Sequence, residues 1–175
     1  MSIRHPTFFG VLALLPALVN CNNARGTCVG GQCSGKGECA VQWDNAKYVG
    51  QCVGGHAEGV GEMEWNDKSV YKGEFKDGEP NGFGKKWWKN GNLYEGSWKD
   101  GFRNGKGKIT YGGGGSYEGD WVNGDHVGEG VVIQKDGRKG VGHFDKDVLN
   151  GPCTWYAPDG SIEFQGTCKD GKPVK

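Results

Sequence analysis

Cysteine and histidine are the residues of this 175-residue chain that are best suited to bind a metal or to react covalently. Four of the seven cysteines lie close together in the sequence, at Cys28, Cys33, Cys39 and Cys52. Their spacings, with four, five and twelve intervening residues, differ from the paired CxxC spacing of structural zinc sites. The four histidines form no HxxH or HExxH pattern. We therefore expect no metal site, with zinc at these four cysteines as the alternative.

Two other patterns that could support chemistry have a structural explanation. Gly82-Phe83-Gly84 and similar glycine pairs are not followed by the amphipathic helix that a phosphate-binding loop requires. The acidic residues Glu58, Glu62, Glu64 and Asp67 lie on alternating positions, which predicts solvated strand faces rather than a hydrolytic cleft. The sequence therefore predicts a protein that is not an enzyme and binds no cofactor.

The N-terminus resembles a bacterial lipoprotein signal peptide. Arg4 and His5 precede an uncharged, mostly apolar run from Phe8 to Val19, which is too short to span a bilayer but suits a signal-peptide core. The segment Leu18-Val19-Asn20-Cys21 resembles a lipobox, with Asn20 where a small residue is usual. We expect residues 1–20 to be the signal peptide and Cys21 to be lipidated. The alternative is a differently processed signal, with Cys21 in a disulfide.

The cysteine count agrees with lipidation of Cys21. An odd count of seven leaves one thiol over in an exported protein. The other six could form disulfides in an oxidising compartment: Cys28, Cys33, Cys39, Cys52, Cys153 and Cys168. Cys153 and Cys168 flank the Asp159-Gly160 turn, and Cys39 and Cys52 flank residues 44–47, so each of these pairs could join neighbouring strands.

A repeat of 23 residues organises the remaining sequence. Units begin at Tyr48, Tyr71, Tyr94 and Tyr117, each with glycine at positions three, eight, twelve and fourteen and a bulky residue at position five. A weaker fifth unit begins at Gly140, a broken sixth begins at Phe164, and a degenerate unit at Ala24 precedes the array.

The pattern YxGxW-x2-G-x3-G-x-G at this period resembles the MORN repeat family. The resemblance implies β-hairpins stacked into an elongated, twisted sheet, which binds or scaffolds proteins or membrane lipids. We divide the chain into the signal peptide, a segment 21–47 with the lipidated cysteine and a degenerate, cysteine-rich repeat, and a MORN-like array over 48–175.

The residues of one unit independently predict the same fold. The alternation in Tyr71-Lys72-Gly73-Glu74-Phe75-Lys76 indicates a half-buried strand. Asp77-Gly78 supplies a turn, residues 82–88 form the return strand, and turns such as Asn90-Gly91 lead into the next unit. We therefore predict an all-β fold, an elongated single-sheet meander of stacked β-hairpins in which aromatic side chains of neighbouring units pack together.

Two surface features could carry function. Position seventeen, opposite the aromatic packing, holds apolar residues in several units, and residues 71–116 are basic, with nine basic against five acidic side chains. The candidate contact surface consists of Lys85, Lys86, Trp87, Lys108, Ile133 and Tyr156. The alternative for position seventeen is that this face of the sheet is partly covered. The alternative for residues 71–116 is that their basic side chains lie on an ordinary solvated strand face.

The overall charge excludes one class of partner, because 21 basic and 21 acidic residues give no field that favours nucleic acid. We predict an exported, lipid-anchored envelope protein, on the periplasmic or outer-surface side, whose repeats bind an unidentified protein partner. The alternative is direct binding of membrane lipid or glycan through the basic, Trp-bearing units.

Overall fold

The computed structural model describes residues 28–29, 32–33 and 36–174, with side chains from residue 37 onward. Every regular element in these residues is a β-strand, so the predicted all-β class is confirmed. The same residues contain no helix that is long and apolar enough to cross a membrane. The predicted signal peptide, residues 1–20, and the predicted lipidation site, Cys21, lie outside the described residues.

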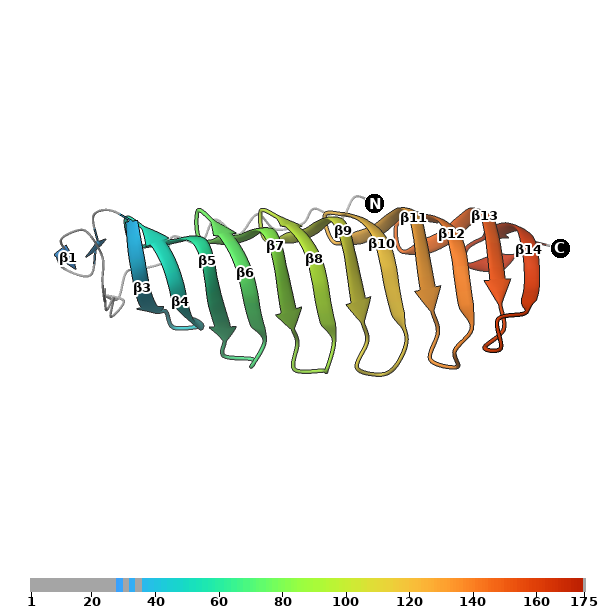
Figure 1. Ribbon diagram of the computed structural model, residues 1–175, viewed down its shortest axis with the longest axis horizontal. Helices are drawn as coiled ribbons and strands as arrows, with labels where there is room; N and C mark the ends of the chain where they lie inside the picture. Colours follow the sequence, from blue (N-terminus) through green and yellow to red (C-terminus); the bar gives the residue numbers. More distant parts are fainter. Residues whose placement is uncertain (1–27, 30–31, 34–35, 175) are drawn as a thin grey trace, which may run out of the picture.

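One antiparallel sheet of thirteen strands contains nearly all of the described chain, with its strands in sequence order (Figure 1). This is the elongated single-sheet meander that the repeat predicts. The strands are β3 (Lys36–Gln42), β4 (Ala46–Val53), β5 (His56–Trp65), β6 (Val70–Lys76), β7 (Glu79–Trp87), β8 (Leu93–Lys99), β9 (Phe102–Thr110), β10 (Ser116–Val122), β11 (Asp125–Ile133), β12 (Lys139–Asp145), β13 (Val148–Tyr156), β14 (Ile162–Lys169) and β15 (Lys172–Pro173). A separate pair, β1 (Cys28–Val29) and β2 (Gln32–Cys33), places the backbones of Cys28 and Cys33 directly opposite each other.

A tight turn joins the two strands of each unit. Between β8 and β9 lie Asp100 and Gly101, whose φ angles are 49° and 79°. Two successive residues with positive φ are typical of a type I′ turn, which matches the twist of the strands that it joins. The same geometry recurs at Asp77-Gly78, Asn123-Gly124 and Asp170-Gly171. We call each such turn, with the strand ends next to it, a hairpin tip.

Wider loops join successive units at the opposite ends of the strands. Between β7 and β8, the Trp88 N–H donates to Asn92 O at 2.9 Å, and the Asn92 N–H donates to the Asn90 side chain at 3.1 Å. A short polar side chain that accepts from the backbone two residues on is a common stabiliser of turns. Equivalent bonds are accepted by Asp67, Asp136 and Asp159. The turns predicted at Asn90-Gly91, Asp136-Gly137 and Asp159-Gly160 are therefore present.

The strands bend along one long edge of the molecule (Figure 1). The Tyr94 hydroxyl donates to Ser97 O at 2.9 Å, whereas an extended strand would separate residues three apart by about 10 Å. The pairing of β8 with β9 also shifts between Gly96 and Trp98, and such a bulge bends a strand. The hairpin tips therefore fold back over the straight parts of the strands. We call the side that they cover the inner face, and the other side the outer face.

The core lies on the inner face. The tyrosines at position one, Tyr48, Tyr71, Tyr94 and Tyr117, are 0% exposed. Each packs edge-to-face on the position-five aromatic of the next unit. All except Tyr48, whose own unit has Cys52 at position five, also pack on that of their own unit. The Tyr94 ring centroid, for example, lies 5.1 Å from Trp98 and 5.2 Å from Trp121. The Trp121 indole also donates to Gly107 O at 3.0 Å. Aromatic side chains thus connect each unit to the next, as predicted.

Glycine at positions three and fourteen leaves room for this packing. Gly96 and Gly107 lie directly opposite each other on β8 and β9. A Cβ atom at Gly96 would overlap Gly107 Cα and lie 2.6 Å from Lys106 O, and one at Gly107 would lie 2.5 Å from Tyr94 Cζ. A larger residue at either position must therefore displace backbone or a buried ring.

The hairpin tips are hydrogen-bonded to one another as well. The Gly101 N–H donates to Pro80 O and the Gly124 N–H donates to Arg103 O, both at 3.0 Å. The corresponding bond recurs from Gly78 to Ala57, from Asp147 to His126 and from Gly171 to Leu149. The tips therefore stack in the same register as the straight parts of the strands.

The cysteines agree with the sequence prediction at one end of the sheet. The predicted Cys153–Cys168 disulfide joins β13 to β14, with Cα atoms 5.8 Å apart. Cys39 and Cys52 are buried thiols instead of the disulfide that the sequence suggests, and the Cys52 thiol donates to Gly37 O at 3.5 Å across the β3–β4 pair. The side chains of Cys28 and Cys33 lie outside the described residues.

Candidate binding groove

The structure divides the predicted contact surface between the two faces. Lys86 lies directly opposite Tyr94, whose ring belongs to the core, so Lys86 points to the inner face. Its neighbours in the strand, Lys85 and Trp87, point to the outer face because successive side chains alternate. Register places the remaining three, Lys108, Ile133 and Tyr156, on the outer face as well. Five of the six residues therefore share one face, and Lys86 belongs to the other.

A row of directly paired residues runs along the outer face, in which the predicted position seventeen alternates with position twenty-three. Val70, Trp87 and Leu93 are consecutive in this row, and Trp87 is 36% exposed. The row continues through Thr110, Ser116, Ile133, Lys139, Tyr156 and Ile162. Its apolar part is therefore continuous around Trp87 and interrupted by polar residues farther along the sheet.

Acidic side chains accompany the basic residues of the outer face. The Lys85 ammonium lies 3.0 Å from a Glu95 carboxylate oxygen, and the Lys108 ammonium lies 3.2 Å from one of Glu118. Exposed pairs of this kind contribute little to stability, but they offset the positive charge that the composition of residues 71–116 implies. The outer face is thus less basic than its lysine content suggests.

A groove opens on the inner face, between the hairpin tips and the loops at the opposite ends of the strands. It has a volume of about 360 Å³. One wall consists of strand and loop residues, and the other consists of residues of the tips. The lining residues are Lys86, Trp88, Asn90, Asn92, Trp98, Gly101, Phe102, Arg103, Ile109 and Gly124. We call this feature the inner groove.

The bend in the strands brings its two walls together. Lys86 is paired with Tyr94, whereas Arg103 is paired with Trp98, four residues farther along β8. In a straight sheet, these two cations would lie more than 10 Å apart along the strand direction. They line one groove because the tips fold back.

The Lys86 ammonium lies among tryptophan rings. It is 4.1 Å from the ring centroid of Trp65 and 5.5 Å from that of Trp88. Burial lowers the pKa of Lys86 from its ordinary value, because the charged form loses hydration. The corresponding position of the other units holds apolar residues: Met63, Ile109, Val132 and Trp155. Lys86 is thus a cation at a position that is otherwise apolar.

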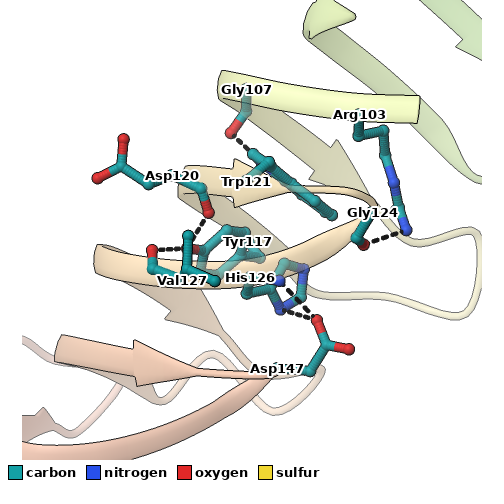
Figure 2. A network of polar contacts seen from close by, with 9 residues as sticks. All are labelled: Arg103, Gly107, Tyr117, Asp120, Trp121, Gly124, His126, Val127 and Asp147. Atoms are coloured by element: carbon teal, nitrogen blue, oxygen red, sulfur yellow. Dashed lines mark hydrogen bonds and ion pairs between the residues drawn. The ribbon is translucent and has the colours of Figure 1, made fainter. Parts of the chain in front are cut away.

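Arg103 is likewise a cation at a position of the hairpin tips that is apolar in three other units. Its guanidinium lies 4.3 Å from the ring centroid of Trp121 and donates to Gly124 O at 2.7 Å, and Figure 2 shows the side chain crossing from its own strand to the next tip. Burial lowers the pKa of Arg103. Units one, two and five place apolar residues here, namely Ala57, Pro80 and Leu149.

His126 fills the equivalent position of the fourth unit and has a structural role. Its ring stacks on Tyr117 with centroids 3.6 Å apart, and its Nδ1 lies 3.1 Å from an Asp147 carboxylate oxygen (Figure 2). The same oxygen accepts the His126 backbone N–H at 2.8 Å. Burial lowers the pKa of His126 to about 4, so the ring is neutral near pH 7. The contacts indicate that His126 connects two tips.

Within the described residues, the structure contains no group of three or more His, Cys, Asp and Glu side chains that could hold a metal ion. The zinc alternative involves Cys28 and Cys33, whose side chains are outside those residues. The groove itself offers aromatic rings, amides and two cations, which can bind a ligand but include no nucleophile beside a base.

Hairpins that stack at a fixed interval, each in contact with its neighbours, define a linear repeat protein. The model of the MORN repeat matches residues 48–70, 71–93, 94–116, 117–137 and 141–162. The matches cover more than half of the chain, which belongs to the MORN repeat family. Repeats of this family generally serve as non-catalytic modules that bind proteins or lipids.

Other comparisons concern whole proteins and folds. None of the curated proteins compared with this chain matches it. Among solved structures, the chain is similar to the TCP domain of SAS-4 (dCPAP) from Drosophila melanogaster, in complex with a proline-rich motif of Ana2 (dSTIL). The TM-score is 0.51 at 10% sequence identity, over 93% of this chain and 84% of that chain. This likeness concerns the fold alone.

Proposed function

We propose that this protein is a non-catalytic binding module whose inner groove holds an extended segment of a partner protein. The observation that carries this proposal is the groove, whose lining includes Trp88, Trp98 and Phe102. Phe102, on the tip wall, is 57% exposed, and Trp88, on the loop wall, is half-buried. Large aromatic side chains that remain partly accessible in a concavity are frequent anchors of protein interfaces.

The shape and lining of the inner groove favour an extended occupant. Aromatic-lined grooves bind proline-rich segments, whose polyproline II conformation is already formed and loses little entropy on binding. The similar TCP domain is in complex with a proline-rich motif of another protein. Both points support an extended, proline-containing segment as the partner of the inner groove.

We further propose that the protein is exported and anchored to the cell envelope by lipid on Cys21. This rests on the apolar run from Phe8 to Val19 and on the cysteine that follows it. Stable anchoring requires more than one acyl chain or a second signal. Mass spectrometry of the protein from native membranes should find Cys21 at the N-terminus and carrying acyl chains. An unmodified Cys21, or a different N-terminus, would exclude the anchor.

The alternative function uses the outer face. Val70, Trp87 and Leu93 form a short apolar row there, and Lys85 lies beside it, so that membrane lipid or a glycan could bind. The ion pair of Lys85 with Glu95 argues against strong attraction to an anionic surface. Binding of the protein to anionic liposomes that is lost in Trp87→Ala would favour this alternative.

Adjacent tryptophans allow the two faces to be compared in one experiment. A photoreactive phenylalanine analogue placed at position 88 or 87 in cells should capture a protein partner from position 88, on the inner face. The captured partner is then titrated with purified variants. We expect Trp88→Ala to weaken binding at least tenfold, because buried tryptophan anchors often contribute about 2 kcal/mol or more.

Trp87→Ala is the matched control and should change the affinity by less than about twofold, as expected for a residue outside an interface. Alanine is compatible with the fold at position eighteen, because Ala157 stands there in the fifth unit. Capture from position 87 alone, or equal effects of the two substitutions, would contradict an inner-face site.

A further inference from the structure

The two cations of the inner groove differ in their surroundings from Lys85 and Lys108 of the outer face. Lys85 and Lys108, on the outer face, each have a carboxylate within 3.2 Å. Among the ion pairs of the residues that the structure describes, none involves Lys86 or Arg103. Both are partly buried, so neither is simply solvated in bulk water.

Burial of such charges is unfavourable unless something offsets the lost hydration. The Lys86 ammonium contacts the rings of Trp65 and Trp88. The Arg103 guanidinium contacts the Trp121 ring and donates to one backbone carbonyl. Cation–π contacts offset part of the cost, but the ammonium and guanidinium groups retain N–H donors. No ion pair of the described residues gives these donors a carboxylate acceptor. Asp67 and Glu79 act on Lys86 only from a longer distance. The same holds for Asp147 and Asp125 with Arg103.

Other units of the same protein have apolar residues at the positions of Lys86 and Arg103. The inner-face positions of Lys86 and Arg103 hold Met63 and Leu149 in other units, and both of those side chains are buried, at 7% and 3% exposure. The array can therefore fold with apolar residues at these two positions. A requirement of folding does not explain why both cations occur on facing walls of one groove.

We propose that the inner groove selects acidic segments, with a carboxylate side chain of the partner bound by Lys86 and Arg103. This inference rests on the proposed function and specifies the chemistry of the partner. Arginine and lysine donate charge-assisted hydrogen bonds to carboxylates, which are stronger than neutral ones. Trp88 contacts an apolar or proline residue next to the acidic residue.

A polypeptide fits this site better than a membrane. The two cations lie on opposite walls of a groove of about 360 Å³, which admits a few side chains, whereas a bilayer presents a continuous surface that cannot enter it. On the outer face, Lys85 and Lys108 already have carboxylate partners. The charge arrangement therefore favours an acidic peptide over anionic lipid.

The test uses the purified full-length protein and three fluorescent ten-residue peptides in which proline alternates with glutamate, glutamine or lysine. Binding is measured by fluorescence anisotropy. We expect the glutamate peptide to bind at least tenfold more tightly than the glutamine peptide, since a hydrogen bond to a charged group commonly has this effect on affinity. The lysine peptide should bind most weakly.

Adjacent lysines provide the matched control. Lys86→Met should abolish the preference for glutamate, while Lys85→Met should retain it within about twofold, because exposed pairs contribute little. Arg103→Leu should also reduce the preference. Met63 and Leu149 show that these residues are accommodated at the equivalent positions, and a thermal unfolding curve verifies that each variant is folded.

Several outcomes would overturn the inference. Equal affinity for the glutamate and glutamine peptides, or equal effects of Lys86→Met and Lys85→Met, would exclude acidic selection. If the glutamine peptide binds in a Trp88-dependent way without any glutamate preference, the inference fails and the proposed function stands. If only phosphatidylserine vesicles bind, and Lys86→Met releases them, the occupant is a membrane and both proposals fail.

Discussion

Replacing Gly96 by alanine is expected to lower the free energy of unfolding by about 3 kcal/mol or more, at the upper end of the effects of overpacking. The new Cβ would overlap Gly107 Cα and lie 2.6 Å from Lys106 O and 2.7 Å from the Tyr94 hydroxyl. Two of these three atoms belong to the backbone of the paired strand and cannot rotate away. Differential scanning calorimetry should show a fall of roughly 6–12 °C in Tm, by the usual scaling for a chain of this size.

Gly113→Ala is the matched control for this substitution. A Cβ at Gly113 would meet no atom within 4 Å, and surface substitutions in open space usually change stability by less than about 0.5 kcal/mol. A small effect of Gly96→Ala, comparable with that of Gly113→Ala, would show that the close approach of β8 and β9 is not as tight as described.

Tyr94→Ala should have the largest effect of the single substitutions considered, about 3–5 kcal/mol, the usual cost of removing a buried aromatic ring. Tyr94 is 0% exposed and contacts Trp98 in its own unit and Trp121 in the next. Its removal leaves a cavity between two units, so the boundary between the third and fourth units loses packing. Chemical denaturation followed by tryptophan fluorescence measures this change.

Tyr94→Phe separates the ring from its hydroxyl group. The phenylalanine keeps the ring contacts and loses only the bond to Ser97 O at 2.9 Å, so we expect a loss of about 1 kcal/mol, typical of one hydrogen bond. If Tyr94→Phe were as destabilising as Tyr94→Ala, the hydrogen bond that holds the bend, and not the ring stacking, would be the main contribution of this residue.

The sequence predicts the periodic part of this structure well. Tyrosine at position one and the alternation that follows it locate β6, β8 and β10, because a strand buried on one face repeats its side-chain pattern every two residues. The Asp-Gly and Asn-Gly pairs locate the hairpin tips, because positive φ angles are required there. Recurrence every 23 residues then fixes the order of the strands in the sheet.

The bend is harder to predict, and the inner groove depends on it. Alternation along a strand is enough to place Lys86 on the opposite face from Lys85 and Trp87, so grouping all three in one contact surface overlooked that signal. The approach of Lys86 to Arg103, however, depends on a bend of the strands near Gly96. The alternation of polar and apolar residues predicts which face a side chain is on, but not where a strand bends. The sequence therefore does not predict that Arg103 and Trp88 line one groove together with Lys86.

The two cysteine pairs illustrate a similar limit. Cys39 lies opposite Gly50, two residues from Cys52, and Cys153 lies opposite Gly166, two residues from Cys168. The two pairs thus have the same offset across their strands, although only the second is a disulfide. Spacing in the sequence identifies such pairs but not their oxidation state, which also depends on thiol contacts and on the redox environment.

Removal of one whole unit, residues 94–116, tests most directly whether 23-residue hairpins stacked on their aromatic side chains form this protein. The deletion joins Leu93 to Tyr117 and restores the pattern at the junction. Small-angle X-ray scattering should find a folded particle that is shorter by about 10 Å, the width of two strands. Removal of residues 94–105 alone, which breaks the period, should prevent folding. An unfolded protein after removal of 94–116, or a folded one of unchanged length, would contradict the stacked-repeat account.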